Sequence, residues 1–591
     1  MADIKIGLSA KELKKRTGKA YLSTKKMLNV DAEEYKNLKL EDKKALQQLV
    51  KAAFILEEVY LIQDNPKNLI FRDFLKAQIK KGSASAKNAM KLFIAQKGIN
   101  AVDSESNKFS LMKGEKELLG KGFYPEDLTV EEFHKILKNM LKEGKDEEVK
   151  NILNQHSMVV RDGKELRSID FKEYFKSQFT RAARHLEEAA KYSTNKDFAE
   201  FLNLQAKALV DADYMSDAYA DKKWAQLQDT PLEFTITREC YSDEMTGTVT
   251  ENPELLKMLQ ERGIVAYPKD YLGFRVGIVN KEGTEKLTVI KKYLPELAKE
   301  MPYCDKYEQN ISATSTDVKQ TMVDVDLVTV KGDVGAYRGG ITLAENLPND
   351  DKLSLTIGGG RRNVYHRQIR AISDTKKLQK VLNATLDKNL HKYYNHEADH
   401  WFTIGHENGH SLGPKSGTEA LGKYRSIIEE NKADMVSMAM LDKLEELGMY
   451  TQEQKKQIMT TFVADLTLKA KPNLSQAHRV RTVMQMNYFI KNGAVEIDKN
   501  GIIHINYEKL IPTAKKMLAE IVDIQISGSF EKGEKYVLEN FVWTDGMEKI
   551  AKKLRKISKT LNGTVKEPLA NRLYRRRIES WKSEEKRYNI E

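Results

Sequence analysis

The stretch His406-Glu407-Asn408-Gly409-His410 determines how the rest of this chain is interpreted. If residues 402–411 form a helix, His406 and His410 lie about 40° apart around its axis, so both imidazoles can face one ion. Glu407 then lies beside them on the same helix. The residues just before the motif carry no charge, which fits a helix that is buried next to a metal. The pattern therefore predicts a metal site.

A third ligand is expected further along the chain. A catalytic zinc ion takes three protein ligands and leaves a fourth position for water. Glu430 follows His410 at the start of a second helical pattern, and Asp434 comes one turn later, where it can accept the free N–H of a ligating imidazole. Zinc lowers the pKa of its bound water from about 15.7 to about 7. We therefore predict one Zn²⁺ per chain on His406, His410 and Glu430, with Glu407 as the base.

A second copy of the motif, His396-Glu397-Ala398-Asp399-His400, lies just upstream. Asp399 would place a charge inside the helix that carries the metal, and no Glu-x3-Asp pair follows His400 at the corresponding distance. We therefore expect His396 and His400 to have structural roles. Gly409 lowers the helix propensity of the preferred copy, which indicates close packing against a neighbouring element.

Composition limits the possible classes of protein. The chain has 591 residues and a net charge of +12, from 98 Lys and Arg against 86 Asp and Glu. No apolar run is long enough to span a membrane, and the N-terminus has no signal-peptide core. The two cysteines, Cys240 and Cys304, form no disulfide framework, which fits a reducing cytoplasm. We expect a cytoplasmic protein with neither nucleic acid nor a membrane as a partner.

The expected secondary structure changes along the chain. Residues 1–228 have helical apolar spacing, whereas residues 232–370 contain alternating strand patterns with a helical insert at 284–301. Helical spacing returns at 371–540, which includes the metal motif. Gly358-Gly359-Gly360 lacks the Lys-Ser/Thr pair of a phosphate-binding loop, so a plain glycine turn is expected there.

Three further short segments of the chain carry candidate functional residues. They are Arg238-Glu239-Cys240-Tyr241-Ser242-Asp243, Asn346-Leu347-Pro348-Asn349-Asp350-Asp351 and Gln476-Ala477-His478. Together with the acidic segment 429–434, they occur in the order found in the dipeptidyl peptidase III family of zinc metallopeptidases. From about residue 120 onward the chain resembles that family, and its five-residue metal motif is similar to that of bacterial members.

The resemblance implies roles for these residues. Tyr241 and His478 would stabilise the oxyanion of the transition state, and Glu239 would hold the free amine of the substrate. Asn346 and Asn349 would anchor the N-terminal end of the peptide. The residues themselves favour part of this interpretation, because positions two apart on a strand point to the same face, as an amine-binding Glu239 and a hydrogen-bonding Tyr241 would require.

We predict an α+β, two-lobed fold with a cleft between the lobes. The mixed lobe is expected from residues 1–282 and 313–370, and the helical zinc-binding lobe from 283–312 and 371–540. Residues 541–591 are expected to form a charged helical tail.

The predicted function is a zinc-dependent exopeptidase that releases dipeptides from the N-terminus of short peptides. A zinc aminopeptidase or oligopeptidase with another cleavage register remains an alternative, and so does a non-catalytic peptide-binding protein. The expected partners are short peptides with a free N-terminus. The sequence leaves open whether the protein is a monomer or a homodimer.

Overall fold

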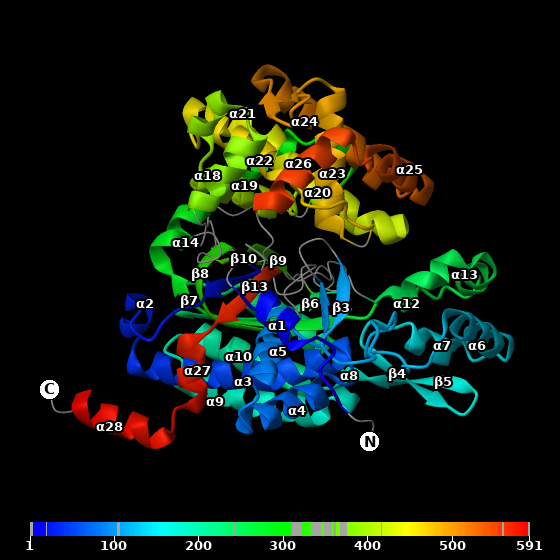
Figure 1. The fold of residues 1–591 in the computed structure, drawn as a ribbon, viewed down its shortest axis with the longest axis vertical. Coiled ribbons are helices and arrows are strands. Elements are labelled where there is room, and N and C mark those ends of the chain that lie inside the picture. Colours follow the sequence, from blue (N-terminus) through cyan, green and yellow to red (C-terminus); the bar gives the residue numbers. More distant parts are fainter. Residues whose placement is uncertain are drawn as a thin grey trace.

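The computed structural model describes most of the chain. The described residues are 4–18, 21–102, 107–239, 243–309, 322–332, 344–347, 357, 362–366, 375–414, 417–474, 476–557 and 561–588. The molecule has the predicted α+β, two-lobed fold: helices α18 to α26 form one group, and the central sheet with its covering helices forms the other (Figure 1). In the described part of the chain no helix has the length and apolar character needed to cross a bilayer.

The mixed lobe begins with helices that cover one central sheet. Its elements up to the sheet's second strand are α1 Ala10–Arg16, β1 Leu22–Lys26, α2 Glu33–Lys36, α3 Leu40–Asp64, α4 Asn68–Lys80, α5 Ala84–Gln96, β2 Asn100–Val102, β3 Lys108–Ser110, α6 Val130–Lys142, α7 Asp146–Ile152, β4 Ser157–Asp162, β5 Glu165–Asp170, α8 Phe171–Tyr174, α9 Lys176–Tyr192, α10 Lys196–Val210, α11 Met215–Ala225, β6 Leu232–Glu239, α12 Glu244–Gly247, η1 Thr248–Glu251, α13 Pro253–Gln260 and β7 Tyr271–Asn280. The described part of the first 228 residues, expected to be almost entirely helical, therefore also contains five short strands.

The central sheet has five strands in the order β6-β7-β8-β10-β9. Strands β8 Met322–Gly332, β9 Ala344–Leu347 and β10 Arg362–His366 complete it. Strand β8 pairs antiparallel with β7 and parallel with β10. Every residue of β8 is buried, although the sequence indicated alternation, because β8 is a central strand that is covered on both faces.

The helical lobe follows, and α14, which packs against β8, leads into it. Its elements are α14 Lys281–Leu287, η2 Thr288–Tyr293, α15 Leu294–Lys299, η3 Cys304–Lys306, α18 Thr375–Thr385, η4 Lys388–Tyr393, α19 His396–Gly409, η5 Thr418–Tyr424, α20 Arg425–Ala439, α21 Leu441–Glu446, α22 Gln452–Asp465, α23 Ala477–Lys491, β11 Val495–Ile497, β12 Ile503–Ile505, α24 Tyr507–Ser527, α25 Phe530–Asn540 and α26 Asp545–Ile557. The glycine-rich segment 358–360 lies outside the described residues.

Two separate hydrophobic cores underlie the two lobes, and they meet at the sheet. On β8, Met322 belongs to the core of the helical lobe, whereas Val323 belongs to the core of the mixed lobe. On β10, Tyr365 and Val364 divide in the same way. This division follows from the strand period, because successive side chains point to opposite faces of the sheet.

The C-terminal segment is not a separate helical tail. Helix α26 contributes Ile550 and Leu554 to the core of the helical lobe. The chain then returns to the mixed lobe, where β13 Leu561–Lys566 pairs parallel with β1. Helices α27 Pro568–Arg575 and α28 Ile578–Tyr588 follow, and Trp581 of α28 donates to Gln47 of α3. Because this segment is rich in charged residues, the apolar positions that pack it against both lobes were not recognised from the sequence.

Helices α19 and α20 approach each other closely in the helical lobe. A Cβ atom at Gly405 would lie 2.3 Å from Ser437 Oγ, and one at Gly409 would lie 2.9 Å from the Ala433 carbonyl oxygen. Glycine at these two positions of α19 therefore permits the contact, as Gly409 in the motif indicated. The contact brings the histidines of α19 next to the acidic residues of α20.

Candidate metal centre

Three side chains from α19 and α20 converge on one point. His406 lies on the last turn of α19, His410 caps that helix at its C-terminus, and Glu430 lies in α20. The two Nε2 atoms are 3.2 Å apart, and Glu430 Oε2 lies 3.5 Å from Nε2 of His406. Among the described residues these three form the one group of His, Cys, Asp and Glu side chains whose donor atoms all lie within 4.8 Å of one another.

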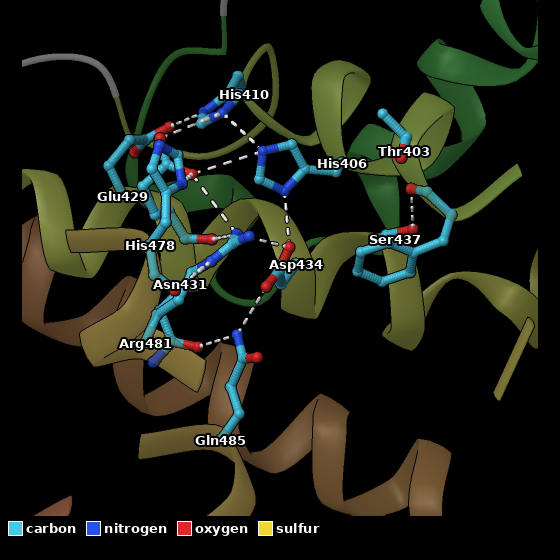
Figure 2. A network of polar contacts seen from close by, with 12 residues as sticks. Thr403, His406, His410, Glu429, Asn431, Asp434, Ser437, His478, Arg481 and Gln485 are labelled. Carbon is cyan, nitrogen blue, oxygen red and sulfur yellow. Dashed lines mark hydrogen bonds and ion pairs between the residues drawn. The ribbon is translucent and has the colours of Figure 1, made fainter. Parts of the chain in front are cut away.

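The orientation of the imidazoles shows which nitrogens face the common point. Nδ1 of His406 lies 2.7 Å from Asp434 Oδ1, and Nδ1 of His410 lies 2.9 Å from Glu429 Oε1 (Figure 2). A carboxylate only accepts, so each Nδ1 carries the proton and each neutral ring turns the lone pair of Nε2 toward the other. Two lone pairs and a carboxylate oxygen at this spacing repel one another unless a cation lies between them.

The donor set fits zinc. Tetrahedral Zn²⁺ with bonds of about 2.0–2.1 Å places neighbouring donor atoms about 3.3 Å apart. The 3.2 Å between the two Nε2 atoms and the 3.5 Å from His406 Nε2 to Glu430 Oε2 are close to that spacing, and the 3.9 Å from His410 Nε2 to Glu430 Oε1 is somewhat longer. Carboxylates hold the second nitrogen of both imidazoles, which is the usual support of ligating histidines.

The formal charges around these donors also favour a divalent cation. Glu429, Glu430 and Asp434 bring three carboxylates to the site, and Glu407, which follows His406 in α19, is also buried. The buried Lys432 and the half-buried Arg481 are the cations that contact them. The carboxylates therefore outnumber the cations that contact them, and a divalent cation would offset this excess of negative charge.

Neighbouring charges move the pKa values of this group in opposite directions. Burial alone would raise the pKa of Glu430, but His478, His410 and His406 hold that pKa well below its usual range. Burial lowers the pKa of His410, and its carboxylate neighbours do not reverse this effect. At His406 burial also acts to lower the pKa, but the hydrogen bond to Asp434 raises it overall. Around neutral pH Glu430 is therefore anionic and His410 neutral, as ligation requires.

Helix α23, besides α19 and α20, also contributes side chains to the site. His478 Nδ1 lies 3.0 Å from Glu430 Oε2. Arg481 Nη1 lies 2.8 Å from Asp434 Oδ1, and Gln485 donates to Asp434 Oδ2 at 2.9 Å (Figure 2). His478 was predicted from the sequence, whereas Arg481 and Gln485 were missed. They follow His478 by three and seven residues, which places them on its helix face, and this spacing was the available signal.

Glu429 is a further residue that the sequence analysis missed. Its Oε1 accepts from His410 and pairs with Lys432 at 2.8 Å, while its Oε2 accepts from Gln525. Lys432 also donates to the carbonyl of Leu412 at 2.6 Å. Glu429 therefore holds His410 as Asp434 holds His406. The position of Glu429 directly before the proposed ligand was the only hint.

The predicted peptide-binding residues are described less fully. Tyr241 and Asn349 lie outside the described residues, and only the backbone is described for Glu239 and Asn346. Glu239 ends β6, and Asn346 lies in β9, so they occupy the two edge strands of the sheet. The ladder also places them near opposite ends of β8. Their shared role in anchoring a peptide stays a prediction.

The second motif copy occupies the first turn of the same helix. His396 is the first residue of α19, and the ring of His400 packs on Tyr365 with the ring centroids 4.3 Å apart. Neither histidine belongs to the metal-binding group found among the described residues.

Solved structures share this arrangement of lobes and sheet over nearly the whole chain. The dipeptidyl-peptidase III from Caldithrix abyssi superposes with a TM-score of 0.74, covers 95% of this chain and 100% of its own, and is 24% identical. The enzyme from Corallococcus sp. strain EGB superposes with a TM-score of 0.78, covering 96% of this chain and 99% of its own at 20% identity. This chain has the dipeptidyl-peptidase III fold. The resemblance drawn from the motifs is thereby confirmed for the fold.

A curated relative matches by sequence. It is described as "Nudix hydrolase 3" of Arabidopsis thaliana and is 23% identical over 544 residues, which cover 82% of this chain. The match spans 66% of the length of that protein, so about a third of it has no counterpart here. No family model matches the chain.

Proposed function

We propose that this protein is a zinc-dependent exopeptidase that releases dipeptides from the N-terminus of short peptides. The observation that carries the proposal is the convergence of His406, His410 and Glu430 beside Glu407 within the dipeptidyl-peptidase III fold. The two solved structures of this fold are described as dipeptidyl peptidases, and that activity is proposed here for this chain.

The residues of the chain have distinct proposed roles. When bound, zinc supplies a Lewis acid that polarises a peptide carbonyl and acidifies a water molecule. Glu407 accepts the proton of the attacking water at its carboxylate and returns it to the leaving amine. Tyr241 and His478 donate hydrogen bonds to the oxygen on which negative charge develops. Asp434 and Glu429 keep the imidazoles of His406 and His410 in the tautomer that ligation needs.

The cleavage register is proposed to depend on the peptide's free amine. Glu239 would pair with the ammonium group, and Asn346 and Asn349 would hold the adjacent backbone, so that the second peptide bond reaches the site. A substrate without a charged N-terminus would lose these contacts. The proposed compartment is the cytoplasm, where the thiols of Cys240 and Cys304 stay reduced.

A tetrapeptide assay tests the function and its alternatives. The purified protein is analysed for bound metal and then incubated with a tetrapeptide and with its N-acetylated form, with and without a chelator. We expect about one zinc per chain, chelator-sensitive release of two dipeptides, and little cleavage of the acetylated peptide. Mass spectrometry of the products distinguishes the alternative functions. Release of single amino acids indicates an aminopeptidase, and cleavage of both peptides indicates an oligopeptidase. Binding of the peptide without any cleavage would indicate the non-catalytic protein.

The name of the plant relative gives no second candidate. That protein extends well beyond the matched region, and its described activity belongs to the whole protein.

A further inference from the structure

Two short segments of the mixed lobe carry a strong excess of positive charge. Residues 4–18 hold five Lys and Arg against one Glu, and residues 67–102 hold eight against one Asp. Their combined net charge is therefore +11, whereas the whole chain of 591 residues has a net charge of +12. Residues 549–577 carry a comparable excess, with eleven Lys and Arg against one Glu, so the two segments of the mixed lobe form one of the strongly basic regions of the chain.

The two segments form neighbouring helices. Helix α4 is followed after a short turn at residues 81–83 by α5, the two helices pack together, and α1 packs against α5 (Figure 1). Lys76 of α4 is exposed but pairs with Asp73. The other exposed lysines of these helices form what we call the basic face: Lys11, Lys14, Lys15, Lys80, Lys81, Lys87 and Lys91. Within the described part of the chain none of these seven side chains forms an ion pair with a carboxylate. The charges are thus available to a partner.

Exposed isoleucines accompany these lysines. On α5, Ile94 follows Lys91 by three residues and Lys87 by seven, so the three side chains lie on one side of the helix. Ile70 of α4 and Lys81, the residue that caps this helix, are eleven residues apart and likewise share a side. Ile70 is 57% exposed and Ile94 is 51% exposed.

We propose that the basic face docks this protein on a membrane surface that contains anionic lipid. Lysines next to an anionic leaflet each contribute about a fivefold increase in binding. Isoleucines that stand out between lysines can enter the boundary between the headgroups and the acyl chains. The protein lies on the membrane and does not span it, because no described helix is long and apolar enough to cross.

The composition of the face favours lipid over nucleic acid. The exposed cations of these three helices are lysines, because Arg16 and Arg72 are partly buried, whereas readout of base edges and stacking on bases use arginine and aromatic residues. Neither α4 nor α5 exposes a large aromatic side chain, and their exposed large apolar residues are Ile70 and Ile94. Docking would hold the peptidase close to peptides at the membrane, but the inference does not depend on the peptidase proposal.

Vesicle flotation tests the proposal. The variant Lys80→Gln/Lys81→Gln/Lys87→Gln/Lys91→Gln is compared with Lys150→Gln/Lys257→Gln/Lys491→Gln/Lys535→Gln, which removes the same number of exposed lysines elsewhere. We expect the wild-type protein and the matched control to float with vesicles of phosphatidylcholine and phosphatidylserine at low salt. The basic-face variant should bind about a hundredfold more weakly or worse. None of the three proteins should bind pure phosphatidylcholine, and their melting temperatures should agree.

Several outcomes would contradict the proposal of membrane docking. Absence of wild-type binding to the anionic vesicles, or an equal loss in both quadruple variants, overturns the proposal. Tight binding of duplex DNA by a wild-type protein that ignores the vesicles overturns it in favour of a nucleic-acid surface. The variant Ile70→Ser/Ile94→Ser keeps every charge and should bind vesicles several-fold more weakly. If its binding is unchanged, no apolar insertion occurs and the membrane proposal is wrong.

Discussion

The Asp434 carboxylate lies 2.7 Å from Nδ1 of His406, and both side chains are buried. The hydrogen bond keeps the proton on Nδ1 and leaves Nε2 to bind a metal. Asp434→Asn keeps the shape but loses the negative charge that supports the imidazole. We expect the zinc affinity to fall about 10–100-fold, as measured by competition with a chelator. Asp523→Asn, which changes an exposed residue of the same lobe, is the matched control, and an equal affinity for the two variants would argue against the role of Asp434.

Glu407 and Glu397 are the glutamates of the two motif copies in α19. Glu407 follows the proposed ligand His406 and is buried, whereas Glu397 is exposed at the start of the helix. Glu407→Gln should retain zinc and lose peptidase turnover by about 10²–10⁴-fold, because the attacking water loses its general base. Glu397→Gln should stay near the wild-type rate. The measurements are metal content and initial rate, and a loss in the Glu397 variant alone would identify the upstream copy as the catalytic one.

Arg481 joins two of the carboxylates. Its Nη1 lies 2.8 Å from Asp434 Oδ1 and 3.5 Å from Glu430 Oε2. Arg481→Met removes the positive charge that pairs with these carboxylates. Loss of one partner of a buried pair lowers the free energy of unfolding by about 3 kcal/mol. We expect a lower melting temperature in the metal-free protein and a larger stabilisation by added zinc than in the wild type, because the dication replaces the missing charge.

Arg481→Lys keeps a cation at this position and should recover part of the stability. A fall in melting temperature that is the same with and without zinc would show that Arg481 acts by packing alone.

The sequence revealed the part of the site that depends on local spacing. His406 and His410 are four residues apart in one helix, so their shared direction follows from the helical period. Which carboxylate holds which imidazole depends instead on how α20 crosses α19. That crossing is set by the absence of a side chain at Gly405 and Gly409, and the sequence showed only that Gly409 was unusual.

For the fold, too, the sequence predicted what depends on local patterns and missed the long-range pairings. Helical and strand textures along the chain led to the α+β, two-lobed class. The pairing of β1 with β13 joins Leu22 to Leu561, and no local pattern contains such a contact. The C-terminal segment was therefore expected to be a tail, although it links the two lobes.

Glu567 fastens the returning C-terminal segment to the central sheet. Its Oε1 accepts from Thr329 Oγ1 at 2.7 Å and from the Val330 amide at 2.9 Å, and its Oε2 lies 2.8 Å from Lys331 Nζ. Burial alone would raise the pKa of Glu567, but Lys331 and Lys97 lower that pKa below its usual value. A carboxyl group with a lowered pKa in the folded state stabilises the protein above its unfolded pKa of about 4.3, and this contribution disappears as the pH falls through the folded value.

Glu567→Gln should therefore be less stable than the wild type at neutral pH, by about 3 kcal/mol for the loss of a buried pair. The difference in melting temperature between the two proteins should shrink as the pH falls below about 4, because the wild-type side chain then also becomes neutral. Thermal unfolding followed by circular dichroism across this range gives the measurement. The exposed Glu539→Gln is the matched control and should follow the wild type at every pH. A difference that stays constant from neutral to acid pH would show that Glu567 acts through its hydrogen bonds and not through its charge.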